Sequence, residues 1–302
     1  MRVDPNYLSY ATRSLDSAQS VEQQLTQEMS SGARVNSLSD DPVAVGQNVS
    51  LLNQIQQADT FTQNATEVQG QLQVADSALG SVVTELTQAV TLATSANSGT
   101  LSTTDVKSVS SQLAGIRDEV QSLANSSYQG QYIFAGGQTS STPFTTDTST
   151  SPATTTYNGD SNVNYFATPS GQQIQLNVPG DQIFLSSSGD VFSALNNLIN
   201  DYSGGTVNAG QAATDTAALN TALNYVSQKR VTIDNSINQM SAASDASSNI
   251  KTQLSSAQNN LMQADVASVA TKLSTTETQY TALESMIASL ESSDKSLFEN
   301  LA

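Results

Sequence analysis

The chain has 302 residues, only 12% of them charged, and its formal net charge is −17; a surface this acidic and this poor in Lys and Arg argues against nucleic acid and anionic membrane surfaces as partners. It contains no Cys, His or Trp, which excludes the usual zinc, haem and iron–sulfur ligand sets, disulfide frameworks and Ser-His or Cys-His catalytic pairs. No cofactor is therefore expected. No membrane insertion is expected either, because no apolar run approaches the roughly 18 residues of a membrane span.

The N-terminal segment has the pattern of an amphipathic helix. Its apolar residues recur at steps of three and four, with Glu22 as the one polar break. This stripe consists of Leu8, Ala11, Leu15, Ala18, Leu25 and Met29. Gly32 follows and is expected to end the helix, as glycine does just past a helix C-terminus.

The next stretch, GARVNSLSDDPVAVGQN, places two adjacent carboxylates, Asp40 and Asp41, before Pro42. A catalytic or metal-binding pair would need both groups to converge on one site, whereas neighbouring residues at a helix cap usually diverge. Pro42 suits the first helical position because its missing N–H would be unpaired there. Asp41 then stands at the N-cap, where its carboxylate accepts a hydrogen bond from a free N–H. The stretch therefore predicts a structural helix cap made by Asp41 and Pro42.

Three further apolar stripes indicate a helical rod. The first runs from Val68 to Ala93, and the second runs from Val106 to Leu123 with Thr103 or Thr104 as its expected N-cap. The third runs from Leu219 to Met240, after the middle of the chain. Apolar stripes at helical spacing most often form a monomer's own core, so these three are expected to pack on one another.

The segment from about 129 to 215 has a different character. Short runs rich in β-branched and aromatic residues alternate there with Gly, Pro, Asn and Asp. Ile174, Leu176 and Val178 alternate with polar residues at the period of a half-buried strand. This pattern predicts a small antiparallel β domain inserted between helices. The Ser- and Thr-rich run from Thr139 to Thr156 is equally compatible with a flexible loop.

The C-terminal third carries the longest pattern. Apolar residues recur at steps of four and three over five heptads, with Thr276 and Asp294 filling two gaps, which indicates a coiled coil. The seam consists of Met262, Val266, Val269, Leu273, Tyr280, Leu283, Ile287, Leu290, Leu297 and Leu301. A lone pair of terminal helices has no third surface to cover it. The two ends of the chain are therefore expected to need partners.

Several stretches resemble the flagellin superfamily. SSGARVNSLSDDPVA is similar to the flagellin signature in which a first helix ends at a Ser-Ser-Gly turn and paired aspartates open the second. Three features are closer to the flagellin-type hook-associated proteins, namely Pro42 where flagellins usually have alanine, QGQYIFAGGQTSSTPF, and the ending DKSLFENLA. YNGD and VPGDQIF also fit that group's β domain.

Together with these patterns, the resemblance implies a mainly α fold with an inserted small β domain (α+β). Long N- and C-terminal helices would pair as an antiparallel coiled coil, next to a helical-rod domain and an outward-facing antiparallel β domain. The expected segments are the N-terminal coiled-coil helix and turn 1–40, the rod domain in two parts 41–128 and 216–260, the β domain 129–215, and the C-terminal coiled-coil helix 261–302.

The resemblance implies a structural component of the bacterial flagellum, not an enzyme, that joins hook to filament by axial self-assembly through its terminal helices. The implied partners are further copies in a ring or helical layer, the hook-side junction protein, flagellin, and an export chaperone before secretion. The implied location is extracellular, at the hook–filament junction. The N-terminus has no apolar region and cleavage site of a signal peptide, so export without cleavage through the flagellar type III channel is expected. The residues expected to make the axial contacts are Leu8, Ala11, Leu15, Ala18, Leu25, Met29, Leu273, Tyr280, Leu283, Ile287, Leu290, Leu297 and Leu301.

Other function classes make different predictions. Filament flagellin is the nearest alternative. A secreted adhesin or type III tip protein would have a ligand site in the β domain and termini that are stably folded in the monomer. An enzyme would need a hydrolase activity that is lost when Asp40 or Asp41 is replaced.

Overall fold

The computed structural model describes residues 7–299, and these form long helices with small antiparallel sheets, which confirms the predicted fold class. The chain divides into two compact units. We call the described part of Met1–Gln57 and Ile250–Ala302 the terminal unit, and Ala58–Asn249 the central unit. The division falls inside two long helices, α2 (Pro42–Ala96) and α6 (Ala209–Met262).

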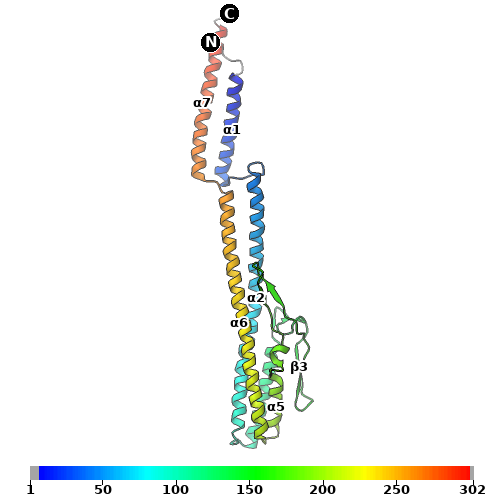
Figure 1. Cartoon of the computed structure of the whole chain (residues 1–302). Coiled ribbons are helices and arrows are strands. Elements are labelled where there is room, and N and C mark those ends of the chain that lie inside the picture. The colour runs from blue at the N-terminus through cyan, green and yellow to red at the C-terminus, as the bar shows by residue number, and fades with distance from the viewer. Residues whose placement is uncertain (1–6, 300–302) are drawn as a thin grey trace. The chain divides into compact units, whose positions relative to one another are not determined.

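In the terminal unit, α1 (Tyr7–Ser31) and α7 (Val266–Glu299) lie side by side and antiparallel (Figure 1). Gly32 ends α1 as predicted, because its φ of +67° is left-handed and its N–H donates to the Glu28 carbonyl at 2.9 Å. The structure corrects the start of the predicted C-terminal seam. Met262 is the last residue of α6 and Val266 the first of α7, so the seam does not run through both.

The central unit has one continuous core made by α2, α3 (Thr103–Ala124), α5 (Val191–Ser203) and α6. This confirms that the three predicted stripes pack on one another. Among its fully buried side chains are Leu79, Val82, Leu86, Leu113, Val120, Leu195, Leu198, Leu219 and Val226. The N-cap of α3 is Ser102, one residue before the predicted threonines. Its hydroxyl accepts from the Asp105 N–H, and the Asp105 carboxylate accepts from the Ser102 N–H.

Helix α5 was missed in the sequence analysis. Asp190 caps it by accepting the Ser193 N–H at 2.8 Å. Its apolar residues follow a helical period and are buried in the central core; they are Val191, Phe192, Leu195, Leu198 and Tyr202. The signal was therefore present, but the helix is short and lies in a segment dominated by turn residues.

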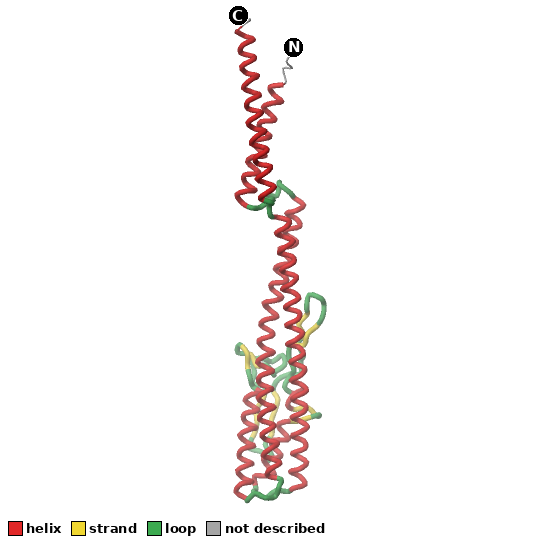
Figure 2. Tube along the Cα trace, turned by 90° about the vertical axis from the view of Figure 1, so that its left-hand side faces the viewer, coloured by secondary structure: helices red, strands yellow, loops and turns green. Residues whose placement is uncertain are grey.

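The strands form four separate two-stranded antiparallel sheets, and no larger sheet occurs among the described residues. The pairs are β1 (Ser127–Tyr128) with β2 (Gln131–Tyr132), β3 (Phe144–Asp147) with β4 (Thr154–Tyr157), β5 (Tyr165–Ala167) with β6 (Gln173–Gln175), and β7 (Leu185–Ser186) with β8 (Gly189–Asp190). The short helix α4 (Asp181–Phe184) precedes β7. Figure 2 shows these strands beside the helices of the central unit.

The predicted strand at Ile174, Leu176 and Val178 is only partly present. Ile174 is buried in β6, against Phe61 and Met240, but β6 ends before Leu176. The Ser- and Thr-rich run from Thr139 to Thr156 was compatible with either strands or a flexible loop. In the structure it contains β3 and the start of β4.

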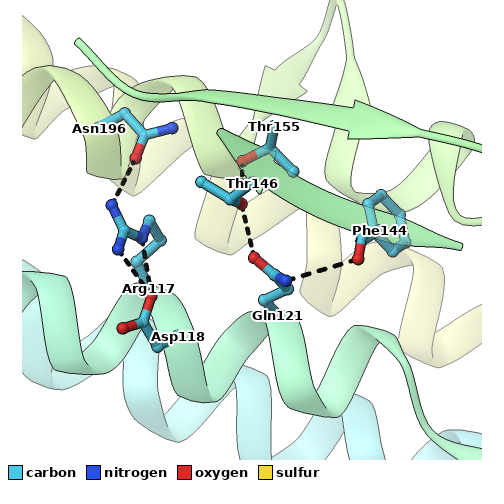
Figure 3. A network of polar contacts seen from close by, with 7 residues as sticks. All are labelled: Arg117, Asp118, Gln121, Phe144, Thr146, Thr155 and Asn196. Carbon is cyan, nitrogen blue, oxygen red and sulfur yellow. Dashed lines mark hydrogen bonds and ion pairs between the residues drawn. The ribbon is translucent and has the colours of Figure 1, made fainter. Parts of the chain in front are cut away.

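A polar network fixes the β3–β4 hairpin on α3 (Figure 3). The Gln121 amide donates to the Phe144 carbonyl at 3.5 Å and accepts from the Thr146 hydroxyl at 2.5 Å. Nearby, the buried Arg117 side chain donates to the carboxylate of Asp118 at 2.7 and 3.0 Å and to the Asn196 amide of α5 at 3.4 Å. The network therefore links α3 to both the hairpin and α5.

Candidate functional site

Two interruptions of the helices meet in the terminal unit. One is the linker 32–41 between α1 and α2, and the other is the linker 263–265 between α6 and α7. The Arg34 N–H donates to the Met262 carbonyl at 2.7 Å, and the Ala264 N–H donates to the Gly32 carbonyl at 2.9 Å. An antiparallel bridge between Ala33 and Gln263 lies between these bonds. The two linkers are therefore joined by their backbones.

The side chain of Arg34 strengthens this junction. Its guanidinium donates to the Leu261 carbonyl at the end of α6 and pairs with Asp41, where the Nη1–Oδ2 distance is 3.1 Å. Asp41 directly precedes α2, and its second carboxylate oxygen accepts the Ala44 N–H at 3.0 Å, which is the geometry of an N-cap. The Ala44 amide and then the Arg34 guanidinium lower the pKa of Asp41. Both ionic groups are partly exposed, so the pair orients the linkers more than it stabilises them.

Asp40 serves a different turn from Asp41. Its carboxylate accepts the N–H groups of Asn36 and Ser37 at 2.9 and 2.8 Å and the Ser37 hydroxyl at 2.7 Å. The Ser37 hydroxyl and the two backbone amides lower the pKa of Asp40. The two adjacent carboxylates therefore have separate partners and do not converge on a common site.

The predicted contact residues lie along the α1–α7 pair, with unequal burial. On α1, Ala11 and Leu25 are buried, Leu15 and Ala18 are half-buried, and Met29 is exposed. On α7, the half-buried residues are Leu273, Tyr280, Leu283 and Ile287. Leu8, Leu290 and Leu297 belong to the two helices, but their side chains are outside the described set, and Leu301 lies outside the described residues.

Polar groups interrupt the packing between α1 and α7. Leu25 packs with Ala264, Val269 and Leu273 in a small cluster. Thr276, predicted as a gap in the seam, is buried. Farther along, Glu284 and, with a smaller effect, Glu22 raise the pKa of Tyr280 through their negative charge. The pair is thus only partly apolar along its length.

An open groove of 630 Å³ follows the same two helices. Its apolar wall includes Val21, Leu25 and Val269, and charged residues such as Arg34 and Lys272 also line it. Two helices cannot cover such a groove by themselves, so it stays open in the single chain.

Large apolar side chains of the terminal unit are exposed, and apart from Met29 and Val266 they do not belong to the stripes predicted from the sequence. Of the twelve large hydrophobic residues that are exposed in the described part of the chain, ten belong to this unit. They are Tyr10, Val21, Met29, Leu38, Val43, Val49, Leu52, Ile250, Val266 and Met286. Their signal in the sequence was an apolar residue within a largely polar helix, except for Leu38, which lies in the linker 32–41.

Residues 5–139 match the family model described as the bacterial flagellin N-terminal helical region. This part of the chain is therefore similar to the N-terminal helical region of bacterial flagellins. Over 121 residues the chain is 38% identical to flagellar hook-associated protein 3 of Salmonella typhimurium, a stretch that spans 40% of this chain and 38% of that protein. The chain therefore aligns with well under half the length of this curated relative.

Two solved structures share the fold. One is a Vibrio parahaemolyticus protein provisionally assigned to the flagellar hook-associated proteins, with a TM-score of 0.67 and 19% identity over 74% of this flagellin-like chain and 100% of the other. The second is flagellar hook-associated protein 3 of Legionella pneumophila, with a TM-score of 0.61 and 15% identity over 70% of this chain and 98% of the other. These identities support a shared fold alone. The sequence matches confirm the predicted resemblance to the flagellin superfamily.

Within residues 7–299, none of the helices is long and apolar enough to cross a membrane. The same residues contain no group of three or more acidic, His or Cys side chains that could hold a metal ion.

Proposed function

We propose that this protein is a structural component of the bacterial flagellum that joins hook to filament, and that it assembles axially through its terminal unit. The observation that carries this proposal is the concentration of exposed apolar side chains in the terminal unit, ten of the twelve in the described chain. The similarity to flagellar hook-associated protein 3 supports the junction role.

The geometry supports repeated contacts between identical chains. The α1–α7 pair buries one narrow seam and leaves its groove and outer faces open. A neighbouring copy that covers these faces would exclude water from apolar side chains at about 25 cal/mol per Å². Contacts of this head-to-tail kind do not close on one pair and generate rings or helical layers. The predicted contact residues on α1 and α7 would take part, together with Val49 and Leu52 of α2.

The proposed junction role also implies the partners, the location and the mode of action of the protein. The neighbours would be further copies, the hook-side junction protein and flagellin, with an export chaperone before secretion. The location would be extracellular, at the hook–filament junction, after export without a cleaved signal peptide. The protein would act through assembly and would catalyse no reaction. We also propose that the chain is organised into the coiled-coil, rod and β segments expected from the sequence.

Two valines provide a matched test. Val49 in the terminal unit is 53% exposed and Val231 in the central unit is 55% exposed, and both lie on helices. In cells that lack the wild-type protein, we expect Val231→Asp to restore filaments and Val49→Asp to reduce their number by about tenfold or more, because an unpaired carboxylate in an interface costs several kcal/mol. Electron microscopy counts filaments, and immunoblotting measures flagellin in the medium.

The outcomes separate the functions. Cells without the protein should have hooks without filaments and release flagellin into the medium. Filaments that stay attached in those cells would contradict the junction role. If the protein itself makes up the bulk of the filament, it is the filament flagellin. Equal filament numbers with Val49→Asp and Val231→Asp would show that the exposed face of α2 around Val49 is not part of the assembly interface.

A further inference from the structure

The junction between α5 and α6 contains two facing carboxyl groups that the proposed assembly does not use. Asp201 lies near the end of α5 and Asp215 in the second turn of α6. Asp215 is only 6% exposed. The Oδ2 atom of Asp201 is buried and has no hydrogen-bond partner, and the Asp201 carboxyl group lies within hydrogen-bonding reach of the Asp215 carboxyl group. Two acceptors therefore oppose each other without a donor.

The hydroxyl and amide donors around the pair are already engaged. The Gln211 amide donates to Asp215 Oδ2 at 2.9 Å and leaves Asp201 unpaired. The Tyr202 hydroxyl donates to the Ala93 carbonyl at 3.2 Å and to the Asn97 amide oxygen at 2.9 Å. On the α6 side, the hydroxyl of Thr216 donates to the Ala212 carbonyl at 2.6 Å. None of these groups supplies a hydrogen to Asp201.

The charged groups on the neighbouring helices do not compensate the repulsion between Asp201 and Asp215 either. The Lys107 side chain of α3 lies against Gly205, in the loop between α5 and α6. The pKa of Asp201 is nevertheless determined by burial and then by Asp215, and not by the charge of Lys107. Asp105, in the first turn of α3, is engaged by Ser102. α2 contributes the uncharged Asn97, which donates to Thr216 at 3.1 Å. Tyr202, the other titratable neighbour, feels both carboxylates, and burial and their charge raise its pKa.

We propose that Asp201 and Asp215 form an acid-sensitive lock at the α5–α6 junction. With one shared proton, Asp201 donates an O–H···O bond to Asp215, and the junction is closed. With no proton, the two carboxylates repel each other and one buried oxygen has no partner, so the junction opens locally. The loop between the two helices contains Gly204 and Gly205, which allows such an opening.

The direction of the pH dependence follows from the environment of Asp201. Burial, and then the neighbouring Asp215, raise the pKa of Asp201 from 3.8 to about 6. Because the folded pKa lies above the unfolded one, the folded state binds the proton more tightly. The stabilising contribution is fully present below 3.8 and is lost as the pH rises through about 6. The lock therefore tightens on mild acidification.

Hydrogen–deuterium exchange of the full-length chain tests this lock. After correction for intrinsic exchange rates, we expect protection across 191–216 to be roughly three- to tenfold higher at about pH 5 than at about pH 7.5, relative to the rest of the central unit. Asp201→Asn replaces the shared proton by an amide N–H that can donate to Asp215 at both pH values. This variant should keep high protection at about pH 7.5 and show a pH ratio near one.

Asp245→Asn is the matched control, since it removes one negative charge from an exposed position on α6. It should keep the pH ratio of the wild type. The lock is overturned if Asp201→Asn keeps that ratio too, or if the wild type shows no extra protection at about pH 5. Since the measurement uses the unassembled protein, its outcome does not depend on the flagellar role.

Discussion

The two units of this protein use the same helical patterns and bury them to different extents. In the central unit, four helices enclose a core whose leucines and valines are buried, and the ring of Phe144 packs against Phe184 and Phe192 at centroid distances of 5.3 and 5.4 Å. In the terminal unit, the buried apolar cluster around Leu25 has three members. A helical stripe thus becomes a core only where enough neighbouring stripes exist in the same chain.

Deleting one buried leucine in each unit should give the largest contrast. Leu86→Ala leaves a cavity in the enclosed core and should destabilise the central unit by about 2–5 kcal/mol. Leu25→Ala lies beside an open groove that water can enter, so we expect less than half of that loss in the monomer. Urea unfolding followed by circular dichroism measures both. Equal losses would mean that the terminal unit is as well packed as the central one.

Adding a methyl group should sharpen the same contrast with a smaller effect. A Cβ at Gly180 would lie 2.6 Å from ring carbons of Phe144, so Gly180→Ala should destabilise the central unit by about 1–3 kcal/mol. A Cβ at Gly46, in the terminal part of α2, would meet nothing within 4 Å. Gly46→Ala should stabilise that helix by about 0.5–1 kcal/mol. Thermal unfolding of the purified chains distinguishes the two, and a loss of stability with Gly46→Ala would contradict the open packing.

Acid should act on the two units with opposite sign, which is the smallest of these effects. The Ala44 amide and Arg34 lower the pKa of Asp41, so its stabilising contribution is present above 3.8 and is lost as the pH falls through the folded pKa. We expect the Ala44 N–H to stay protected from exchange at about pH 5 and to lose protection as the pH falls through the folded pKa of Asp41, which lies below 3.8. Asp41→Asn keeps the acceptor and should show no such acid-dependent loss. Loss of protection already at about pH 5 would contradict this assignment.

The features that the sequence predicted correctly depend on local chemistry. Gly32 ends α1 through its own backbone, and helix α2 begins at Pro42, next to the capping carboxylate of Asp41. The stripes of the central core also carried enough apolar residues to be recognised. Their packing together confirmed the interpretation of a monomer's own core.

The features that were missed depend on contacts between distant segments. The break between Met262 and Val266 contains neither Gly nor Pro, and its backbone is held by the linker after α1. The exposure of Val49 reflects the absence of covering residues, which a helical period does not reveal. Likewise, Asp201 and Asp215 are unremarkable in the sequence and oppose each other only because α5 and α6 meet.

The backbone junction between the linkers has a consequence for protein engineering. Because the segment after α1 and the segment before α7 are hydrogen-bonded to each other, the two ends of the polypeptide form one exchangeable module. A chimaera that takes its beginning from one relative and its ending from another would combine linkers that were never matched. Grafts between relatives should therefore transfer both ends together.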